Sequence, residues 1–431
     1  DIIGHPFFSS DRNMPAISSF IRSSLPPALG MLSCCVVFAA DYEEPVRLEL
    51  ASQMPDLEAK TELYEVAPEV QTDGFLNTYQ VTTDTGEYQI SSTALLKIRL
   101  REVVAIAQMR EIEETQSSSD AIEDDVNEIK EGFSDLVEDP KGTLEGAASG
   151  VGKLFKLGGE AWNSRHTRKD ENKLSNLGKT VVGYDKAWRE YAGQFGVDPY
   201  SSNEALKSEL DRLATAASQG SAFSMVAKAL IPGGLGFAIS ATGMSQALNE
   251  MLITSSELEL RIINREKLVA MGVDPLLAEQ FLDDPTMSPS FKTYLVGSLE
   301  TMEGTEGKSY FIQFAVDSES EDVAMFRASS AILYAYYHGS QRPIKQLIQA
   351  GPIVTGIDEE NDLVVAAPLD YLLWTEALET AIASIEEDTA DSELNSRHLL
   401  LTGDVSDQAE HELEERGWTV HSKIKPDSDA S

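Results

Sequence analysis

The strongest constraint on the fold is a helix-ending signal that recurs along the chain. Gly-Val-Asp-Pro stands at 196–199 and again at 272–275, each time after apolar residues at helical spacing. Asp-Pro at 139–140 and Ser-Pro at 288–289 repeat the signal without the glycine. A glycine after a helix readily adopts the left-handed conformation, and Asp or Ser before Pro caps and opens the next helix. The signal therefore predicts a series of short helices joined by tight turns.

Both copies of Gly-Val-Asp-Pro are interpreted as structural, with a ligand-binding loop as the alternative. In the first copy, residues 198–201 fit a β-turn with proline in its second position. Ser201 and Glu204 then have the spacing of a capping box for a helix over about 202–217. In the second copy, Asp274 caps the next helix and Pro275 opens it.

Hydrophobic periodicity predicts helices over most of the middle of the chain. The predicted helices span 93–114, 180–194, 202–217, 255–271, 275–282, 289–302, 308–337 and 370–386. Because strand signals gather near the two ends, we expect a mainly α, helical bundle-like protein with small β-hairpin and C-terminal β-α-β elements, within the α+β class.

Two hairpins and one strand–helix–strand unit make up the predicted β structure. Alternating residues at 78–83 and 87–91 flank a Gly-containing turn, and 353–355 and 363–365 predict a second hairpin. Residues 397–424 fit a strand–helix–strand unit. In this unit Ser406 caps the helix, Gly417 ends it, and Trp418 follows where an apolar contact with Leu413 is favoured.

Changes in composition divide the chain into five predicted regions. They are a leader (1–39), an N-terminal β-hairpin with a helix (40–117), an amphipathic helical hairpin that is acidic and then basic (118–170), a helical domain (171–350) and a C-terminal α+β element (351–431). This division predicts one exported protein with several small folding units.

The first region has the features of a secretory leader. An uncharged stretch follows Arg22, and Val37-Phe38-Ala39 fits the cleavage pattern that would leave Ala40 first. The alternative is a lipoprotein anchored at Cys34. Cys34 and Cys35 are the two cysteines of the chain, so cleavage after Ala39 leaves no disulfide and stability must come from the core. We expect export to the periplasm or cell envelope.

The charge of the chain argues against a nucleic-acid partner. It has 34 basic and 72 acidic residues, a net charge of −38. Such an excess repels phosphate. One region reverses the sign. Residues 118–139 hold nine acidic residues and one lysine, whereas 140–169 hold six basic and two acidic residues.

An apolar stripe with a period close to eleven residues runs through the acidic and the basic region, from Val126 to Trp162, and stays on one helix face. The basic region is therefore predicted to form an amphipathic helix. A helix of this kind can lie in a membrane interface with its Trp and Lys side chains at the headgroups. The predicted contacts with an anionic membrane or a protein partner are Leu144, Val151, Lys153, Leu154, Phe155, Lys156 and Trp162. The alternative is that this helix packs on the acidic helix before it.

No catalytic, cofactor-binding or metal-ligating residue is predicted, and no cofactor. The stretch 147–155 resembles a phosphate-binding loop, but Ala147 replaces the first glycine and Leu154 replaces the hydroxyl residue. The six histidines are scattered, although His398 and His421 are expected on adjacent strands. Carboxylates are too numerous for a catalytic pair to be chosen.

Several stretches of the chain resemble an uncharacterised family of exported bacterial proteins. The stretches that carry the resemblance are "GEYQISSTALLKIRLREV", "VEDPKGTLEGAASGVGKLF", "VDPYSSNEAL", "PLDYLLWTEAL" and "GDVSDQAEHELEERGWTV". The resemblance implies export and a shared architecture, and it supplies no activity.

The function we expect is that of a non-enzymatic envelope or interaction protein that touches a membrane through its basic amphipathic helix. A hydrolase of the envelope is the first alternative, and it would require a deep cleft lined by two or three close carboxylates. The second is a membrane-inserting protein that uses residues 221–248, since the stretch 229–249 is uncharged and about long enough to span a bilayer. Pro-Gly-Gly at 232–234 favours a buried helical hairpin there instead.

Overall fold

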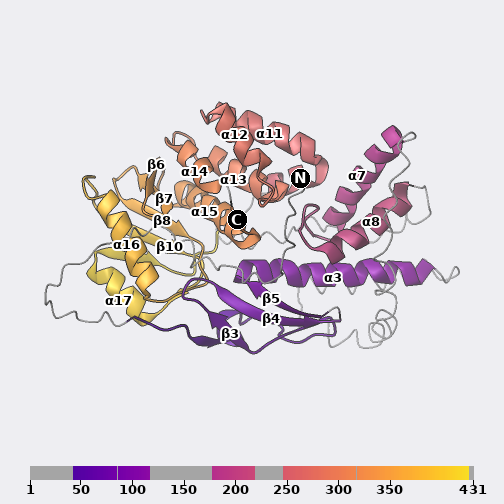
Figure 1. Ribbon diagram of the computed structural model, residues 1–431, viewed down its shortest axis with the longest axis horizontal. Helices are drawn as coiled ribbons and strands as arrows, with labels where there is room; N and C mark the ends of the chain where they lie inside the picture. The colour runs from indigo at the N-terminus through magenta and orange to yellow at the C-terminus, as the bar shows by residue number, and fades with distance from the viewer. Residues whose placement is uncertain (1–41, 85, 117–176, 219–245, 317, 427–431) are drawn as a thin grey trace, which may run out of the picture.

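The protein has an α+β fold with two five-stranded sheets (Figure 1). The computed structural model describes residues 42–84, 86–116, 177–218, 246–316 and 318–426. The expectation of a mainly α, helical bundle-like chain is therefore wrong, because the sheets are larger than the predicted hairpins. Several strands have only three or four residues, too few for alternation to stand out in the sequence.

The first sheet is antiparallel and is built around one long strand. Its strands are β1 (Arg47–Glu49), β2 (Tyr64–Val66), β3 (Glu69–Thr72), β4 (Asn77–Thr83) and β5 (Gly86–Ser91), with the single-turn helix α2 (Leu50–Gln53) after β1. β5 pairs along one edge of β4, while β3 and β2 share the other edge. The predicted hairpin is confirmed by β4 and β5, and the predicted helix after it by α3 (Thr93–Gln116).

The middle of the chain is helical, as predicted. Its helices are α7 (Leu177–Gln194), α8 (Glu204–Ser218), α10 (Gln246–Thr254), α11 (Glu257–Ala270), α12 (Pro275–Asp283), α13 (Pro289–Thr301), α14 (Lys308–Ala315) and α15 (Glu321–Ser340). α13 lies at the centre, with every residue from Ser290 to Leu299 buried. The single helix predicted over 308–337 is divided into α14 and α15, because the acidic stretch between them leaves the helical path.

The second sheet is mixed and lies between two layers of helices. Its strands are β6 (Ile344–Ala350), β7 (Ile353–Asp358), β8 (Leu363–Ala367), β10 (Arg397–Leu401) and β12 (Trp418–His421), in the order β12-β10-β8-β7-β6. β8, β10 and β12 are parallel, and the connections between them carry α16 (Glu376–Asp388) and α17 (Asp407–Glu415). A two-stranded pair, β9 (Tyr371–Leu372) and β11 (Asp404–Val405), lies beside it.

Burial on both faces explains why the strands of this sheet are almost continuously apolar. In β8, Val364 belongs to the core shared with α10–α15, while Leu363 and Val365 belong to the core under α16 and α17. The predicted details of the C-terminal unit are confirmed. Ser406 accepts the Ala409 N–H as the cap of α17, Gly417 has a φ of 80°, and Trp418 is buried in one cluster with Leu413.

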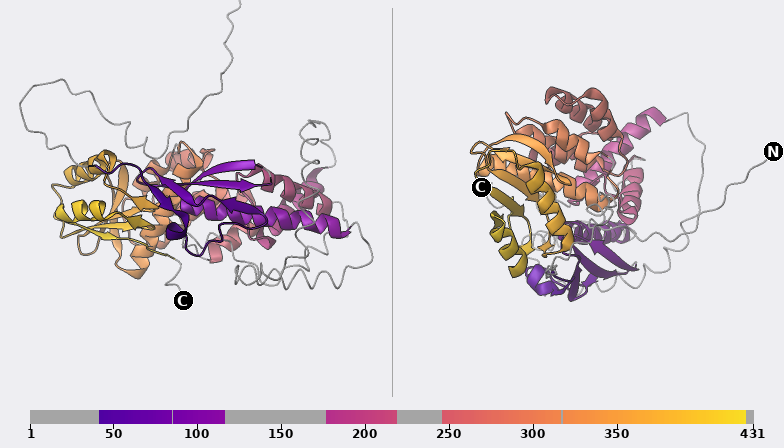
Figure 2. Two further views of the ribbon diagram at one scale, coloured as in Figure 1. Left: turned by 90° about the horizontal axis from the view of Figure 1, so that it is seen from below. Right: turned by 60° about the vertical axis from the view of Figure 1, so that its left-hand side comes forward.

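α3 joins the N-terminal sheet to the helices α7 and α8. Its first half packs Leu96 and Leu100 against the sheet, and its second half packs Ile106 and Met109 against α7 and α8. The predicted region 171–350 thus contributes to two separate cores, since α10–α15 pack with the second sheet. Figures 1 and 2 agree that the second sheet lies at one end of the molecule and α7 and α8 at the other.

A buried carboxyl ties the two sheets together. Asp370 Oδ2 accepts the backbone N–H groups of Asn77, at 2.9 Å, and of Thr93, at 3.0 Å. The Asp370 N–H in turn donates to the carbonyl of Phe75 at 2.9 Å. Desolvation raises the pKa of Asp370 to about 6, against the lowering effect of these hydrogen bonds. This joint holds the starts of β4 and α3 against the segment between β8 and β9.

Candidate functional site

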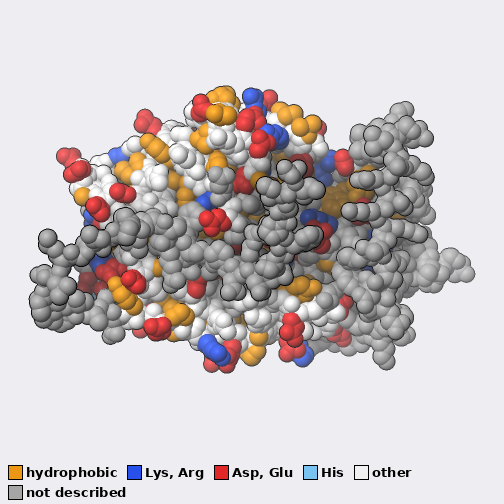
Figure 3. Space-filling view, in the orientation of Figure 1, with side chains coloured by type: hydrophobic (Ala, Val, Ile, Leu, Met, Phe, Trp, Pro, Cys, Tyr) orange, Lys and Arg blue, Asp and Glu red, His pale blue; other side chains and the backbone are white. Residues whose placement is uncertain are grey.

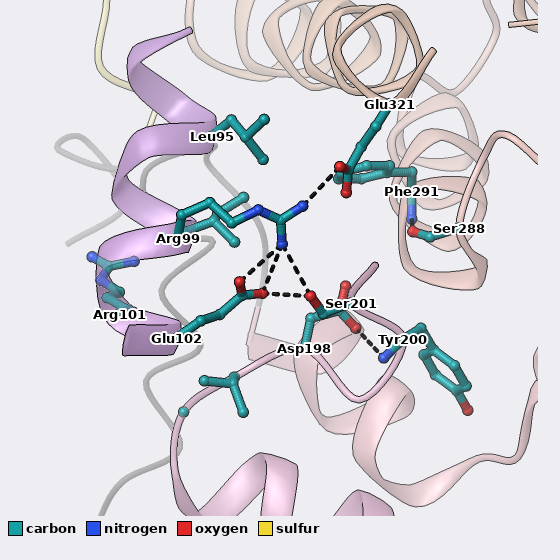
Figure 4. A pocket seen from close by; sticks show the side chains of 13 residues that line it. Leu95, Arg99, Arg101, Glu102, Asp198, Tyr200, Ser201, Ser288, Phe291 and Glu321 are labelled. Atoms are coloured by element: carbon teal, nitrogen blue, oxygen red, sulfur yellow. Dashed lines mark hydrogen bonds and ion pairs between the residues drawn. The ribbon is translucent and has the colours of Figure 1, made fainter. Parts of the chain in front are cut away.

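The candidate site is a hollow where α3, the turn after α7 and the starts of α13 and α15 meet (Figure 4). It is open to solvent and has a cavity volume of about 30 Å³, room for only a few water molecules. Apolar side chains such as Leu95, Ile98 and Phe291 form part of its wall. Three carboxylates, Glu102, Asp198 and Glu321, share it with Arg99. Arg99 and Glu102 lie one turn apart on α3, whereas Asp198 and Glu321 come from distant segments of the chain.

The turn that enters the hollow is the first copy of Gly-Val-Asp-Pro. Gly196 has a φ of 63°, and the Ser201 N–H donates to the Asp198 carbonyl at 3.2 Å, so the predicted β-turn is confirmed. The predicted capping box is wrong, because Asn203 Oδ1 accepts the first N–H groups of α8 instead. Ser201 is not available as a cap because its hydroxyl contacts Glu102.

Arg99 is the centre of the site and donates to both sides of the hollow (Figure 4). Its Nη2 donates to Glu321 Oε2 at 2.7 Å and to Ser202 Oγ at 2.6 Å. Its Nη1 donates to Glu102 Oε2 at 2.9 Å and to Ser201 Oγ at 3.1 Å. Burial alone would lower the pKa of Arg99, but the Glu102 and Glu321 carboxylates outweigh it and raise the pKa.

Glu102 is the deepest charge of the site, with only 1% of its side chain exposed. Within the described ranges, all the hydrogen bonds that it accepts come from side chains. Arg99 donates to both oxygens, Ser201 Oγ donates to Oε1 at 2.5 Å, and Asn203 Nδ2 donates to Oε2 at 2.9 Å. A buried carboxylate needs such partners, because an unpaired charge would be costly there.

Ser201 is held in a way that prevents it from acting as a nucleophile. Its hydroxyl donates to Glu102, and its oxygen accepts from Arg99 and from the Asn203 N–H at 3.1 Å. A hydroxyl oxygen has two lone pairs, and both are occupied by these donors. Attack on a substrate would require the loss of at least one of these hydrogen bonds.

Asp198 lies beside this network and is bound by the protein as well. Its Oδ1 accepts the Tyr200 N–H at 2.8 Å and the Ser290 hydroxyl at 2.5 Å. Desolvation raises the pKa of Asp198 to about 6, and the nearby charges of Glu102 and Glu321 act in the same direction. The carboxyl of Asp198 therefore changes its charge near pH 6.

Together these contacts make the hollow a joint between three parts of the fold. The polar atoms described above bind one another, and Arg99 links α3 to α15 and to the turn before α8. Arg99 and Glu102 were not predicted as site residues, because only the apolar positions of α3 were used to predict this helix. The signal was present, since the two residues are three apart, a spacing that favours ion pairs on a helix.

The second copy of Gly-Val-Asp-Pro is structural, as predicted. Gly272 has a φ of 82°, Asp274 Oδ1 accepts the first N–H groups of α12, and Pro275 opens the helix. The same holds for Ser288, which caps α13 before Pro289. The first copy differs because its turn also brings Asp198 and Ser201 into the hollow.

The predicted contact residues lie outside the described part of the chain. These are Leu144, Val151, Lys153, Leu154, Phe155, Lys156 and Trp162, and most of 221–248 lies outside it as well. Among the described residues, no helix is both long and apolar enough to cross a membrane. The described ranges also contain no group of three or more His, Cys, Asp or Glu side chains placed to hold a metal ion. The expected proximity of His398 and His421 is confirmed, with ring nitrogens 3.1 Å apart.

Comparison with known proteins adds no relative to these observations. No protein family model, no curated protein and no solved structure matches this chain.

Proposed function

We propose that the protein is an exported, non-enzymatic interaction protein of the cell envelope that touches an anionic membrane surface through residues 140–163. The observation that carries the proposal is the local reversal of charge in a chain of net charge −38. Residues 140–169 hold six basic and two acidic side chains and a stripe that includes Leu154, Phe155 and Trp162. Basic and aromatic side chains around an apolar stripe favour the headgroup region of anionic lipid.

The attachment of this segment to the fold supports the proposal. α3 ends at Gln116 before the segment and α7 begins at Leu177 after it. Ile106 of α3 and Tyr191 of α7 belong to one apolar cluster. Both neighbouring helices are thus anchored in the same core. If the segment that joins them binds lipid, it attaches this core to the membrane at both of its ends.

The hollow around Arg99 supports an envelope hydrolase less well. It has the three close carboxylates that such an enzyme would need, namely Glu102, Asp198 and Glu321. However, Glu102 and Glu321 both accept from Arg99, and Asp198 accepts from Ser290 and the Tyr200 N–H. A general acid or base must be within hydrogen-bond reach of a substrate proton. Here both oxygens of Glu102 and of Glu321, and Oδ1 of Asp198, accept hydrogen bonds from the protein.

Flotation with lipid vesicles tests the proposal. The full chain is mixed with anionic or with neutral vesicles, beside a variant with Leu154, Phe155 and Trp162 changed to Ser. We expect the wild type to float with anionic vesicles, less with neutral ones, and less at high salt, because salt screens the attraction. The triple variant is expected to remain at the bottom of the gradient.

A matched control removes apolar side chains from a described surface. Leu258 and Ile262 lie one turn apart on α11 and are 65% and 48% exposed. Figure 3 shows apolar side chains along this upper edge, over α11 and α12. The double Ser variant at these positions should float like the wild type. If the double Ser variant also stays at the bottom, exposed apolar side chains bind the vesicles nonspecifically, and the binding cannot be assigned to residues 140–163. If the wild type itself does not float, packing of the basic helix on the acidic one is favoured.

A further inference from the structure

Two histidines face each other on neighbouring parallel strands of the second sheet. His398 lies on β10 and His421 on β12, where the register pairs Leu400 with His421. His398 Nδ1 and His421 Nε2 are 3.1 Å apart, and the ring centroids are 5.2 Å apart. The His398 side chain is 14% exposed, while His421 is exposed at the edge of the sheet. The pair is therefore reachable from solvent.

Hydrogen bonds on the far side of His398 fix which nitrogen carries its proton. His398 Nε2 lies 2.8 Å from Ser396 Oγ and 3.4 Å from Asp362 Oδ2. We assign the proton of the Ser396 hydroxyl to the Asp362 carboxylate, which can only accept. His398 Nε2 must then donate, so it holds the ring proton. His398 Nδ1 consequently presents its lone pair to His421.

Asp362 is in turn held by an arginine. Arg342 Nη1 lies 2.6 Å from Asp362 Oδ2 and 3.3 Å from Asp358 Oδ2. Only 7% of the Asp362 side chain is exposed. His398 thus donates its Nε2–H to Ser396, beside a fixed carboxylate, and an outer hydrogen bond of this kind orients metal-binding histidines. The oriented ring and its neighbour on β12 thus form two aligned nitrogen donors.

We propose that His398 and His421 form a binding site for a divalent transition metal ion of the zinc class. Two nitrogens bound to one tetrahedral zinc at about 2.0–2.1 Å are about 3.3 Å apart, close to the distance seen here. The ion replaces the hydrogen bond between the rings, and the proton of His421 moves from Nε2 to Nδ1, which frees the Nε2 lone pair. Each histidine then binds as a neutral ligand through one lone pair.

The chemistry of the donors selects the kind of metal. Imidazole nitrogen suits Zn²⁺, Cu²⁺ and Ni²⁺, whereas Mg²⁺ and Ca²⁺ prefer oxygen. Since no group of three metal-binding side chains occurs in the described residues, water fills the remaining positions. Such an open site is weaker than a closed structural zinc site, and its exposed positions remain available to an outside ligand.

Titration of the full chain with ZnCl₂ tests the site. The protein is prepared without a histidine tag. Isothermal titration calorimetry is run at about pH 7.5, where protons compete little with zinc for the imidazole nitrogens. We expect one zinc per chain for the wild type. His421→Ala removes an exposed ligand, and zinc should bind at least about tenfold more weakly, since even loss of an outer-shell partner weakens metal sites about 10–100-fold. Circular dichroism confirms that this variant is folded.

His411→Ala is the matched control. His411 lies on α17, contacts Glu415 and is 66% exposed. This variant should bind zinc like the wild type. With Cu²⁺, electron paramagnetic resonance should show two nitrogen ligands in the wild type and one in His421→Ala. The proposal fails if the wild type binds no zinc, or if His421→Ala binds it as tightly as the wild type.

Discussion

Two clusters in this protein are each built around an arginine, which pairs with two carboxylates in one and with three in the other, and they differ in what they leave open. The Arg99 cluster consists of Arg99, Glu102, Ser201, Ser202 and Glu321. The Arg342 cluster consists of Arg342, Asp358, Glu360, Asp362, His398 and His421. In the first, the charged groups bind one another across three parts of the fold. In the second, the chain of contacts ends at two imidazole rings near solvent.

The difference shows how the same charges can serve structure or function. Around Arg99, the buried carboxylate of Glu102 is satisfied only by side chains, which join α3 to distant segments. Around Arg342, the buried carboxylate of Asp358 accepts two backbone N–H groups, from Glu360 and Asp362, at 2.9 Å each. The backbone thus holds the second cluster rigid, and its outermost members are left to face a ligand.

The largest effect is expected from Glu102→Ala. The substitution leaves Arg99 without its buried partner and removes acceptors from Ser201 and Asn203. Breaking a buried ion pair by removing one member costs about 3–5 kcal/mol of folding free energy. Urea unfolding followed by tryptophan fluorescence measures the loss. Glu321→Ala is the control, because Glu321 is 34% exposed, and it should cost about 1 kcal/mol or less. Equal losses would contradict the distinction between the inner and outer partners of Arg99.

The Arg99 cluster also illustrates what sequence could and could not reveal. Local signals were read correctly, such as the caps Asp274 and Ser406, because a cap depends on a few neighbouring residues. Arg99 and Glu321 are 222 positions apart, and no local pattern pairs them. Proximity of His398 and His421 could be predicted, because a β-α-β unit places its two strands side by side. The strand β6 was missed because Lys345 and Gln346 interrupt its apolar pattern.

A smaller effect is expected for the charge of Asp198. Its pKa of about 6 in the folded protein lies above the ordinary value of 3.8. Between these values the folded state binds more protons than the unfolded state, so stability falls as pH rises through this window and is flat above it. Asp198→Asn keeps the oxygen that accepts from Tyr200 and Ser290 but has no charge. It should be about 1–2 kcal/mol more stable than the wild type at pH 7.5, and this gain should shrink toward pH 5.

Unfolding midpoints at several pH values test this prediction. Asp370→Asn is a second test of the same pH dependence. The pKa of Asp370 is also about 6, but this residue lies at the joint between the two sheets. If Asp198→Asn is less stable than the wild type at every pH, the hydroxyl of Ser290 requires a charged acceptor. The Asp198 carboxyl would then belong with the ionised groups of the Arg99 cluster.

The smallest effect is expected from Tyr337→Phe in the Arg342 cluster. The Tyr337 hydroxyl donates to Asp358 Oδ2 at 2.9 Å, and its removal leaves the backbone donors and Arg342 in place. Loss of one hydrogen bond to a charged group that keeps other partners should cost about 1 kcal/mol. Zinc binding by the histidine pair should be unchanged, because Asp362 remains oriented by Arg342. A loss as large as that of Glu102→Ala would mean that side chains, and not the backbone, hold both clusters, and the contrast between them would disappear.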